Sequence, residues 1–155
     1  MIHINEYLLG KDKKLNIIYA TNENIRQIVK DELDKFGHDA DLNHIDVSKV
    51  TDMTMLFCCD QYGLGSKYND LNPDISEWDV SEVKDMWGMF KNCKKFDQDI
   101  SGWNTMKVEI MYAMFMGCEN FNQDLSGWNI QSVKYHDSMF NDCPIKEEYK
   151  PKFKN

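Results

Sequence analysis

The sequence predicts an α/β repeat solenoid in which short parallel strands and short helices alternate. Tryptophan recurs every 25 residues, at Trp78, Trp103 and Trp128, and three other residue types keep the same interval. A unit of this length is too short to bury its own apolar face, whereas stacked units cover one another. The other recurring positions are Phe90, Phe115 and Phe140, Asp74, Asp99 and Asp124, and Val83, Val108 and Val133.

The interval divides the chain into four units, at residues 41–73, 74–98, 99–123 and 124–143. The first unit is the least regular, because Ile45 stands where the others have tryptophan and eight extra residues follow Phe57. These extra residues include two glycines and are mostly polar, which predicts a loop. Cys58 and Cys59 are expected at the edge of that loop.

Each unit contains a pattern for a strand and a pattern for a helix. In residues 74–78, DISEW, an inward isoleucine alternates with outward aspartate and serine, as in a short strand. In residues 80–90 the apolar side chains recur mainly at every third position, which favours a short α-helix or 3₁₀-helix. Asp85, and Asp52 in the first unit, are expected to cap this helix.

The segments on either side of the units differ from them in composition. Residues 1–40 are expected to form an N-terminal cap of one strand and one helix, because repeat arrays need atypical ends. The strand is expected over residues 15–20, LNIIYA, and the helix over residues 24–36, ended by Gly37. Residues 144–155 form a short basic tail.

The repeat resembles that of a known family. The pattern F-[ND]-Q-D-[IL]-S-x-W-[DN]-[VIT], followed by V-x-x-M-x-x-M-F-x-x-C, is similar to the BspA-like leucine-rich-repeat surface proteins of bacteria, a mycoplasma-type domain of unknown function. The likeness covers residues 41–143. It implies a leucine-rich-repeat-like solenoid, a binding role and a place at the cell surface, and it implies no catalytic residue. The pattern weakens toward its end, where Ile110 and Tyr135 replace the capping aspartate and His136 replaces a methionine.

Charge and hydropathy exclude several classes of partner. The chain holds 18 basic and 26 acidic residues, a net charge of −8, and phosphate backbones and anionic lipids repel such a chain. No nucleic-acid partner is therefore expected. No membrane insertion is expected either, because no apolar run approaches the roughly 20 residues of a membrane helix. The segment MIHINEYLLGKDKK lacks the pattern of a secretory signal, so the cytoplasm is the alternative to the cell surface.

Two repeated rows could carry chemistry, and each has a simpler interpretation. Cys93, Cys118 and Cys143 could form a redox or metal ladder, but no second type of ligand accompanies them, and free cysteine packs as a small apolar side chain. The aspartates that recur every 25 residues could bind calcium. Because stacked carboxylates repel each other, we expect each to accept backbone N–H groups in a turn instead. No metal and no cofactor are expected.

The function expected from the sequence is non-catalytic protein binding. Serine-hydrolase, phosphate-loop and zinc-protease motifs are all absent from the sequence, so an enzyme is not expected. Trp87 lies off the tryptophan row and aligns with Tyr112, which predicts an exposed pair. The candidate binding residues are Glu77, Trp87, Tyr112, Tyr62 and Tyr68.

The acidity of the units predicts the character of the partner. Residues 41–143 hold 17 acids and 8 lysines, a net charge of −9, so the partner is expected to be a protein of basic character. The chain itself is expected to be a monomer or a weak dimer. The alternative function is that of a cytosolic immunity-type or regulatory protein that binds one intracellular partner.

Overall fold

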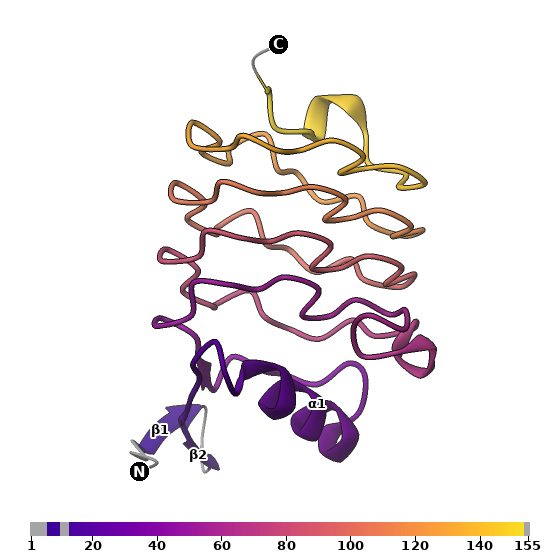
Figure 1. Ribbon diagram of the computed structural model, residues 1–155. Helices are drawn as coiled ribbons and strands as arrows, with labels where there is room; N and C mark the ends of the chain where they lie inside the picture. Colours follow the sequence, from indigo (N-terminus) through magenta and orange to yellow (C-terminus); the bar gives the residue numbers. More distant parts are fainter. Residues whose placement is uncertain (1–5, 10–12, 154–155) are drawn as a thin grey trace.

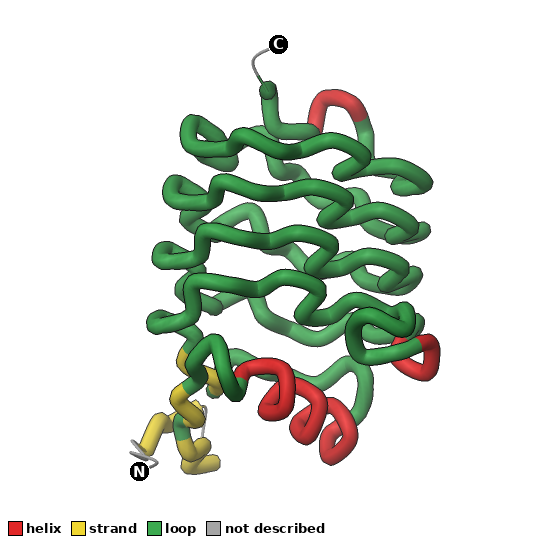
Figure 2. The backbone as a smooth tube through the Cα atoms, in the orientation of Figure 1, coloured by secondary structure: helices red, strands yellow, loops and turns green. Residues whose placement is uncertain are grey.

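The predicted α/β repeat solenoid of the leucine-rich-repeat type is wrong. The computed structural model describes residues 6–9 and 13–153, and most of this part of the chain consists of turns and loops (Figure 2). The described residues contain one α-helix, and their parallel strands form only a small open sheet. The elements are β1 (Glu6–Leu9), β2 (Lys13–Asn16), β3 (Ile18–Tyr19), α1 (Ile25–Phe36), β4 (Ile45–Asp46) and the 3₁₀ turns η1 (Ser66–Tyr68) and η2 (Glu147–Tyr149).

The helix predicted over residues 24–36 is confirmed as α1 (Figure 1). It buries Ile25, Val29 and Leu33 on one face, and it ends at Gly37, whose φ of 95° takes the chain out of the helix. The single strand predicted over residues 15–20 is instead divided in two. β2 pairs antiparallel with β1, and β3 pairs parallel with β4. Within the described residues, no helix is long and apolar enough to cross a membrane.

The three-residue spacing of apolar side chains comes from β-turns. The N–H groups of Val83, Met89 and Cys93 donate to the carbonyl oxygens three residues earlier, at 2.9, 3.2 and 2.9 Å. Both ends of each turn are buried. The chain makes these i→i+3 bonds without the i→i−4 bonds of an α-helix. The helix predicted over residues 80–90 is therefore wrong, and so is the strand predicted over residues 74–78, which is another such turn.

A reversal of backbone handedness keeps these turns from continuing as a helix. Met55, Gly88, Ala113 and Ser138 occupy equivalent positions, and their φ angles lie between 52° and 57°. Each is the third residue of a turn, where a type II turn requires a positive φ. Side chains other than glycine adopt this conformation at a cost of about 1–2 kcal/mol. The sequence uses glycine at only one of the four positions.

We therefore expect Ser138→Gly to stabilise the protein by about 0.5–1 kcal/mol, because glycine removes the cost of a positive φ. Urea unfolding followed by fluorescence measures the change. Ser132→Gly is the matched control, because the φ of Ser132 is not positive. It should destabilise the protein by about 0.5–1 kcal/mol. A loss of stability in both variants would show that the positive φ carries no strain.

Successive units are joined by a ladder of backbone hydrogen bonds. In each of the first three units, four N–H groups of the ladder donate to four carbonyl groups of the next unit, at 2.7–3.1 Å. Bonds in the opposite direction occur where each ladder starts, as from the Lys84 N–H to the Thr51 carbonyl, and also from the Lys94 N–H to the Asn69 carbonyl beyond the ladder. In Figure 1 the loops of successive units lie one above another. The donors of the second unit are Met86, Gly88, Phe90 and Asn92, and their acceptors are Ile110, Tyr112, Met114 and Met116.

The ladder gives the stack a direction. Since its donors all face the following unit, each unit presents carbonyl groups on its N-terminal side and N–H groups on its C-terminal side. At the N-terminal end, the Arg26 guanidinium on α1 donates to the carbonyl oxygens of Thr54 and Met55, both at 2.8 Å. The Leu64 N–H donates a hydrogen bond to the Cys58 carbonyl. The first unit is therefore capped by Arg26 of α1 and by its own irregular loop.

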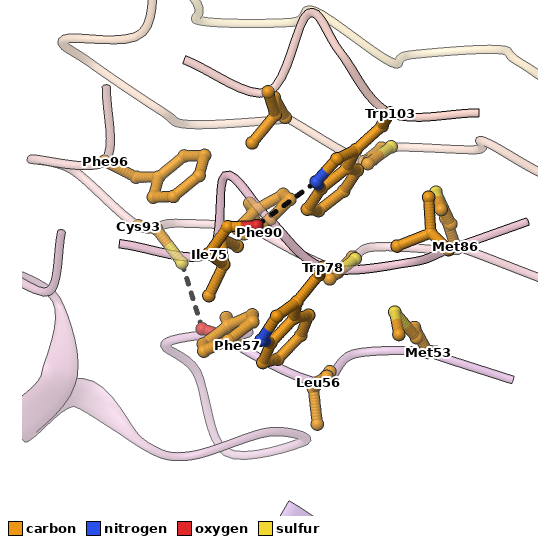
Figure 3. Close-up of a cluster of buried hydrophobic side chains, with 14 of the residues drawn as sticks. Met53, Leu56, Phe57, Ile75, Trp78, Met86, Phe90, Cys93, Phe96 and Trp103 are labelled. Carbon is orange, nitrogen blue, oxygen red and sulfur yellow. Dashed lines mark hydrogen bonds between the residues drawn. The ribbon is translucent and has the colours of Figure 1, made fainter. Parts of the chain in front are cut away.

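Aromatic side chains fill the interior as continuous rows (Figure 3). Phe90 stacks between Phe57 and Phe115, with ring centroids 5.5 and 5.4 Å away. Phe96 lies closer still, at 4.1 Å. The indole N–H of Trp103 donates to the Ile75 carbonyl of the preceding unit at 3.2 Å, and Trp78 and Trp128 make the equivalent bonds. Each unit is thus held to its neighbour by packing and by a buried hydrogen bond.

The repeated aspartates form turns, as expected. The carboxylates of Asp99 and Asp124 accept the N–H groups of the serines two residues later, at 3.0 and 2.9 Å. Hydrogen bonds from these serines lower the pKa of both carboxyl groups. In the first and second units, the equivalent carboxylates of Asp41 and Asp74 also accept the N–H group two residues later. Asp85 and Asp52 likewise accept N–H groups of Trp87 and Thr54, so the predicted helix caps are instead turn residues.

Because of these carboxylates, the stability of the folded protein depends on pH. Because their pKa is lower in the folded state, they stabilise the protein above the ordinary aspartate pKa, and this stabilisation is lost as the pH falls through the lower folded pKa. We expect the melting temperature to fall between about pH 5 and about pH 2. The variant Asp99→Asn/Asp124→Asn should show a shallower fall, because asparagine makes the same turn at Asn104 without titrating. An unchanged slope would contradict this role.

Candidate functional site

Two exposed aromatic side chains lie together on the ladder. Trp87 and Tyr112 are 44% and 42% exposed, and their rings meet edge to face with centroids 6.4 Å apart. The Trp87 carbonyl accepts the Met55 N–H at 2.8 Å, and the Tyr112 carbonyl accepts the Gly88 N–H at 2.9 Å. The backbone under both rings is therefore fixed by inter-unit hydrogen bonds, and the predicted exposure of this pair is confirmed.

A pocket of about 260 Å³ extends this surface toward α1. Tyr62, which is 68% exposed, lines the pocket together with Arg26 and Met55. The Met55 sulfur lies against the backbone of Gly88, because a Cβ atom added there would stand only 2.6 Å from it. Met55 thus connects the pocket with the residue after Trp87. We call Tyr62, Met55, Trp87 and Tyr112 the aromatic surface.

The other two predicted binding residues lie elsewhere. Glu77 is exposed, and its N–H donates to the side-chain oxygen of Asn43 at 2.9 Å, in the turn before Trp78. Tyr68, also a candidate binding residue, is fully buried, so its ring is not available at the surface. The loop folds back on α1, where the Tyr68 hydroxyl donates to Asp34 at 2.6 Å. This bond, with those from Lys30 and Lys67, lowers the pKa of Asp34.

The cysteines offer no reactive group at this surface. Cys93 and Cys118 are fully buried, and their thiols donate to the carbonyl oxygens of Phe57 and Phe90 at 2.9 and 3.0 Å. Burial raises the pKa of both thiols. It also raises the pKa of Cys58 to about 12. A protonated thiol is a poor nucleophile, so packing explains this row.

Cys58 and Cys59 lie at the edge of the loop, as expected, where the Leu64 N–H donates to the Cys58 carbonyl, and both are buried. The Cys59 thiol lies 3.2 Å from that of Cys93. In the part of the chain that the structure describes, no three His, Cys, Asp or Glu side chains gather in a way that could hold a metal ion.

Two residues that matter to this end of the molecule escaped sequence reasoning. Arg26 lies within the predicted helix, and its guanidinium joins α1 to the ladder. His44 is buried, and its Nε2 atom lies 2.7 Å from Glu32 of α1, while its Nδ1 atom has no hydrogen-bond partner among the described residues. Neither contact leaves a signal in the repeat, because the partners lie 12 and 29 residues away in the chain.

Comparison with known proteins places the chain in a family. No curated protein and no solved structure matches it. A family model described as "Mycoplasma protein of unknown function, DUF285" matches residues 23–151. This span includes α1, the four units and the whole aromatic surface. The chain therefore belongs to the Mycoplasma protein family of unknown function DUF285.

Proposed function

We propose that this protein is a non-catalytic module that binds another protein through the aromatic surface. The observation that carries the proposal is the exposure of Trp87 and Tyr112, side by side, on backbone fixed by the ladder. Tryptophan, tyrosine, arginine and methionine are enriched in protein interfaces. A rigid exposed pair also loses little conformational entropy on binding.

The charges around the surface favour a basic partner. Asp52 lines the pocket, and the Asp85 carboxylate accepts the Trp87 N–H at 2.8 Å. In the fourth unit, Asp137 occupies the position equivalent to Trp87 and Tyr112; its carbonyl accepts the Ala113 N–H and its side chain is exposed. Acidic groups at the rim of an apolar patch attract cationic partners and make association sensitive to salt.

Alanine substitution tests the proposal. Once a partner has been isolated from the source cells with the purified chain, Trp87→Ala should weaken its binding about 30-fold, as expected for a central interface residue. Calorimetry measures the affinity. Met106→Ala is the matched control, because Met106 is 49% exposed and lies outside the aromatic surface. Equal affinity of the two variants would refute binding at this surface.

The location of the partner is a separate question. The resemblance of the repeat to BspA-like surface proteins supports a partner outside the cell, whereas the immunity-type or regulatory alternative requires one inside it. Protease treatment of intact source cells, followed by blotting, separates the two. Loss of the band would support the external partner. Full protection until lysis would support the intracellular one.

A further inference from the structure

The C-terminal end of the ladder carries a row of unpaired donors. In the fourth unit, the N–H groups equivalent to those that join the earlier units belong to His136, Ser138, Phe140 and Asp142. None of the four N–H groups donates to an acceptor within the described residues. The corresponding groups of the second unit all donate to the third. The fourth unit thus presents donors with the spacing of the ladder and no acceptors for them.

A groove of about 640 Å³ lies over this row. Its lining includes His136, Ser138 and Phe140 on the unit, and Lys150 and Lys152 on the segment that follows. That segment turns away from the row. The Tyr149 carbonyl accepts the Leu125 N–H at 2.8 Å, and the chain then crosses toward His136, on which Phe153 stacks with ring centroids 3.9 Å apart. The groove remains between the crossing segment and the donors.

The apolar side chains at this end are also incompletely covered. Phe57, Phe90 and Phe115 are fully buried, whereas Phe140, the fourth ring of the stack, is only partly buried. Val133 is partly buried too, while Val83 and Val108 are fully buried. In the earlier units, the next unit covers the equivalent ring and accepts the equivalent N–H groups. In the fourth unit, the Lys150 Nζ atom lies over the Phe140 ring instead, 5.8 Å from its centroid.

The N–H donors and the charged side chains of the groove indicate which kind of molecule can bind there. Donors without acceptors require carbonyl or carboxylate oxygens, and an extended chain offers the carbonyl groups of alternate residues along one edge. Lys150 and Lys152 add positive charge. Glu147 is the acidic residue in the lining, and its carboxylate is paired with Lys150 at 2.7 Å. We propose that this groove binds an extended acidic peptide segment of another protein, which adds to the open edge.

A second copy of the chain does not fit the same edge. Two C-terminal edges would bring donors against donors. A head-to-tail contact would need free carbonyl groups on the N-terminal side of the first unit. There the Arg26 guanidinium already donates to the Thr54 carbonyl, and the Leu64 N–H donates to the Cys58 carbonyl. The fourth unit and the segment after it, which line the groove, lie at the end of the stack opposite α1 (Figure 1).

Amide NMR on the full chain tests the proposal. The probe is a ten-residue peptide of alternating glutamate and valine, whose carboxylates would meet the lysines and whose valines would meet Phe140. Its addition should shift the amide signals of the four donors and slow their exchange with solvent at least about tenfold. Trp87→Ala should bind this probe as well as the original chain does.

Charge variants sharpen the test. Lys152→Glu should weaken binding about tenfold, while Lys95→Glu, an exposed lysine on another unit, should not. Glu147→Gln should strengthen binding by freeing Lys150. Equal binding of an alternating lysine–valine peptide would overturn the proposal, as would reproduction of the shifts by free glutamate. Protection of the four amides without peptide, lost on dilution, would show that a second copy fills the groove and would also overturn it.

Discussion

Phe90→Ala should lower the free energy of unfolding by about 3–5 kcal/mol. The ring is fully buried, and it stacks on Phe57, Phe96 and Phe115. Its removal would leave a cavity lined by these three rings and by Trp103, and rings stacked against the neighbouring units cannot close it easily. Guanidinium unfolding followed by tryptophan fluorescence gives the value.

Phe140→Ala is the matched control for this stack. Phe140 occupies the equivalent position in the fourth unit, but it is only partly buried and stacks on one phenylalanine, Phe115, at 5.7 Å. We expect a loss of about 1–2 kcal/mol, because less area returns to water and solvent fills the space. If both variants lost the same amount, the stack would not be the source of the stability.

Trp103→Phe should destabilise the protein by about 2–3 kcal/mol. The indole is 4% exposed, and its N–H donates to the buried Ile75 carbonyl of the preceding unit. Phenylalanine keeps an aromatic ring but removes this hydrogen bond, which contributes about 0.5–1.5 kcal/mol, although the Ile75 carbonyl still accepts the Trp78 N–H. The substitution also removes buried area stacked against Trp128, which accounts for the rest of the loss. Thermal and urea unfolding both measure the loss.

Trp87→Phe distinguishes this hydrogen bond from a general requirement for tryptophan. Trp87 is 44% exposed, and its indole makes no hydrogen bond with the described residues. The change should alter the free energy of unfolding by no more than about 0.5 kcal/mol. A large loss here, or a small one in Trp103→Phe, would mean that the indole bonds do not hold the units together.

The period of 25 residues predicted the rows of the core. Because equivalent residues of successive units meet, the recurrence of Phe90, Phe115 and Phe140 was enough to predict that these rings stack. The helix over residues 24–36 could also be predicted, since its apolar side chains share one face and Gly37 follows them. Both predictions rest on local spacing, which the sequence displays directly.

The conformation of the units could not be predicted in the same way. Apolar residues three apart are compatible with a 3₁₀-helix and with successive β-turns, and the sign of φ separates the two. Glycine marks the positive φ at Gly88, but Met55, Ala113 and Ser138 adopt it without any such mark. The alternation of Asp, Ile and Ser similarly suggests a strand, whereas a carboxylate that accepts the N–H two residues later makes a turn.

In the candidate site too, the positions of some residues could be predicted from the sequence and those of others could not. The alignment of Trp87 with Tyr112 predicted an exposed pair, because residues at one position of a repeat share a face. Tyr68 lies in the irregular loop, where no alignment indicates its direction, and it is buried against α1. Arg26 reaches the ladder only through the packing of α1 on the first unit, which no spacing in the sequence reveals.

Site-specific photo-crosslinking in the source cells tests the proposed binding function most directly. A photoreactive amino acid at position 112 should yield one discrete adduct with a partner protein, and Trp87→Ala should abolish that adduct. The control position is Phe36 on α1, which is 56% exposed and lies outside the aromatic surface. Adducts of equal yield from both positions, or none from position 112, would contradict binding through the aromatic surface.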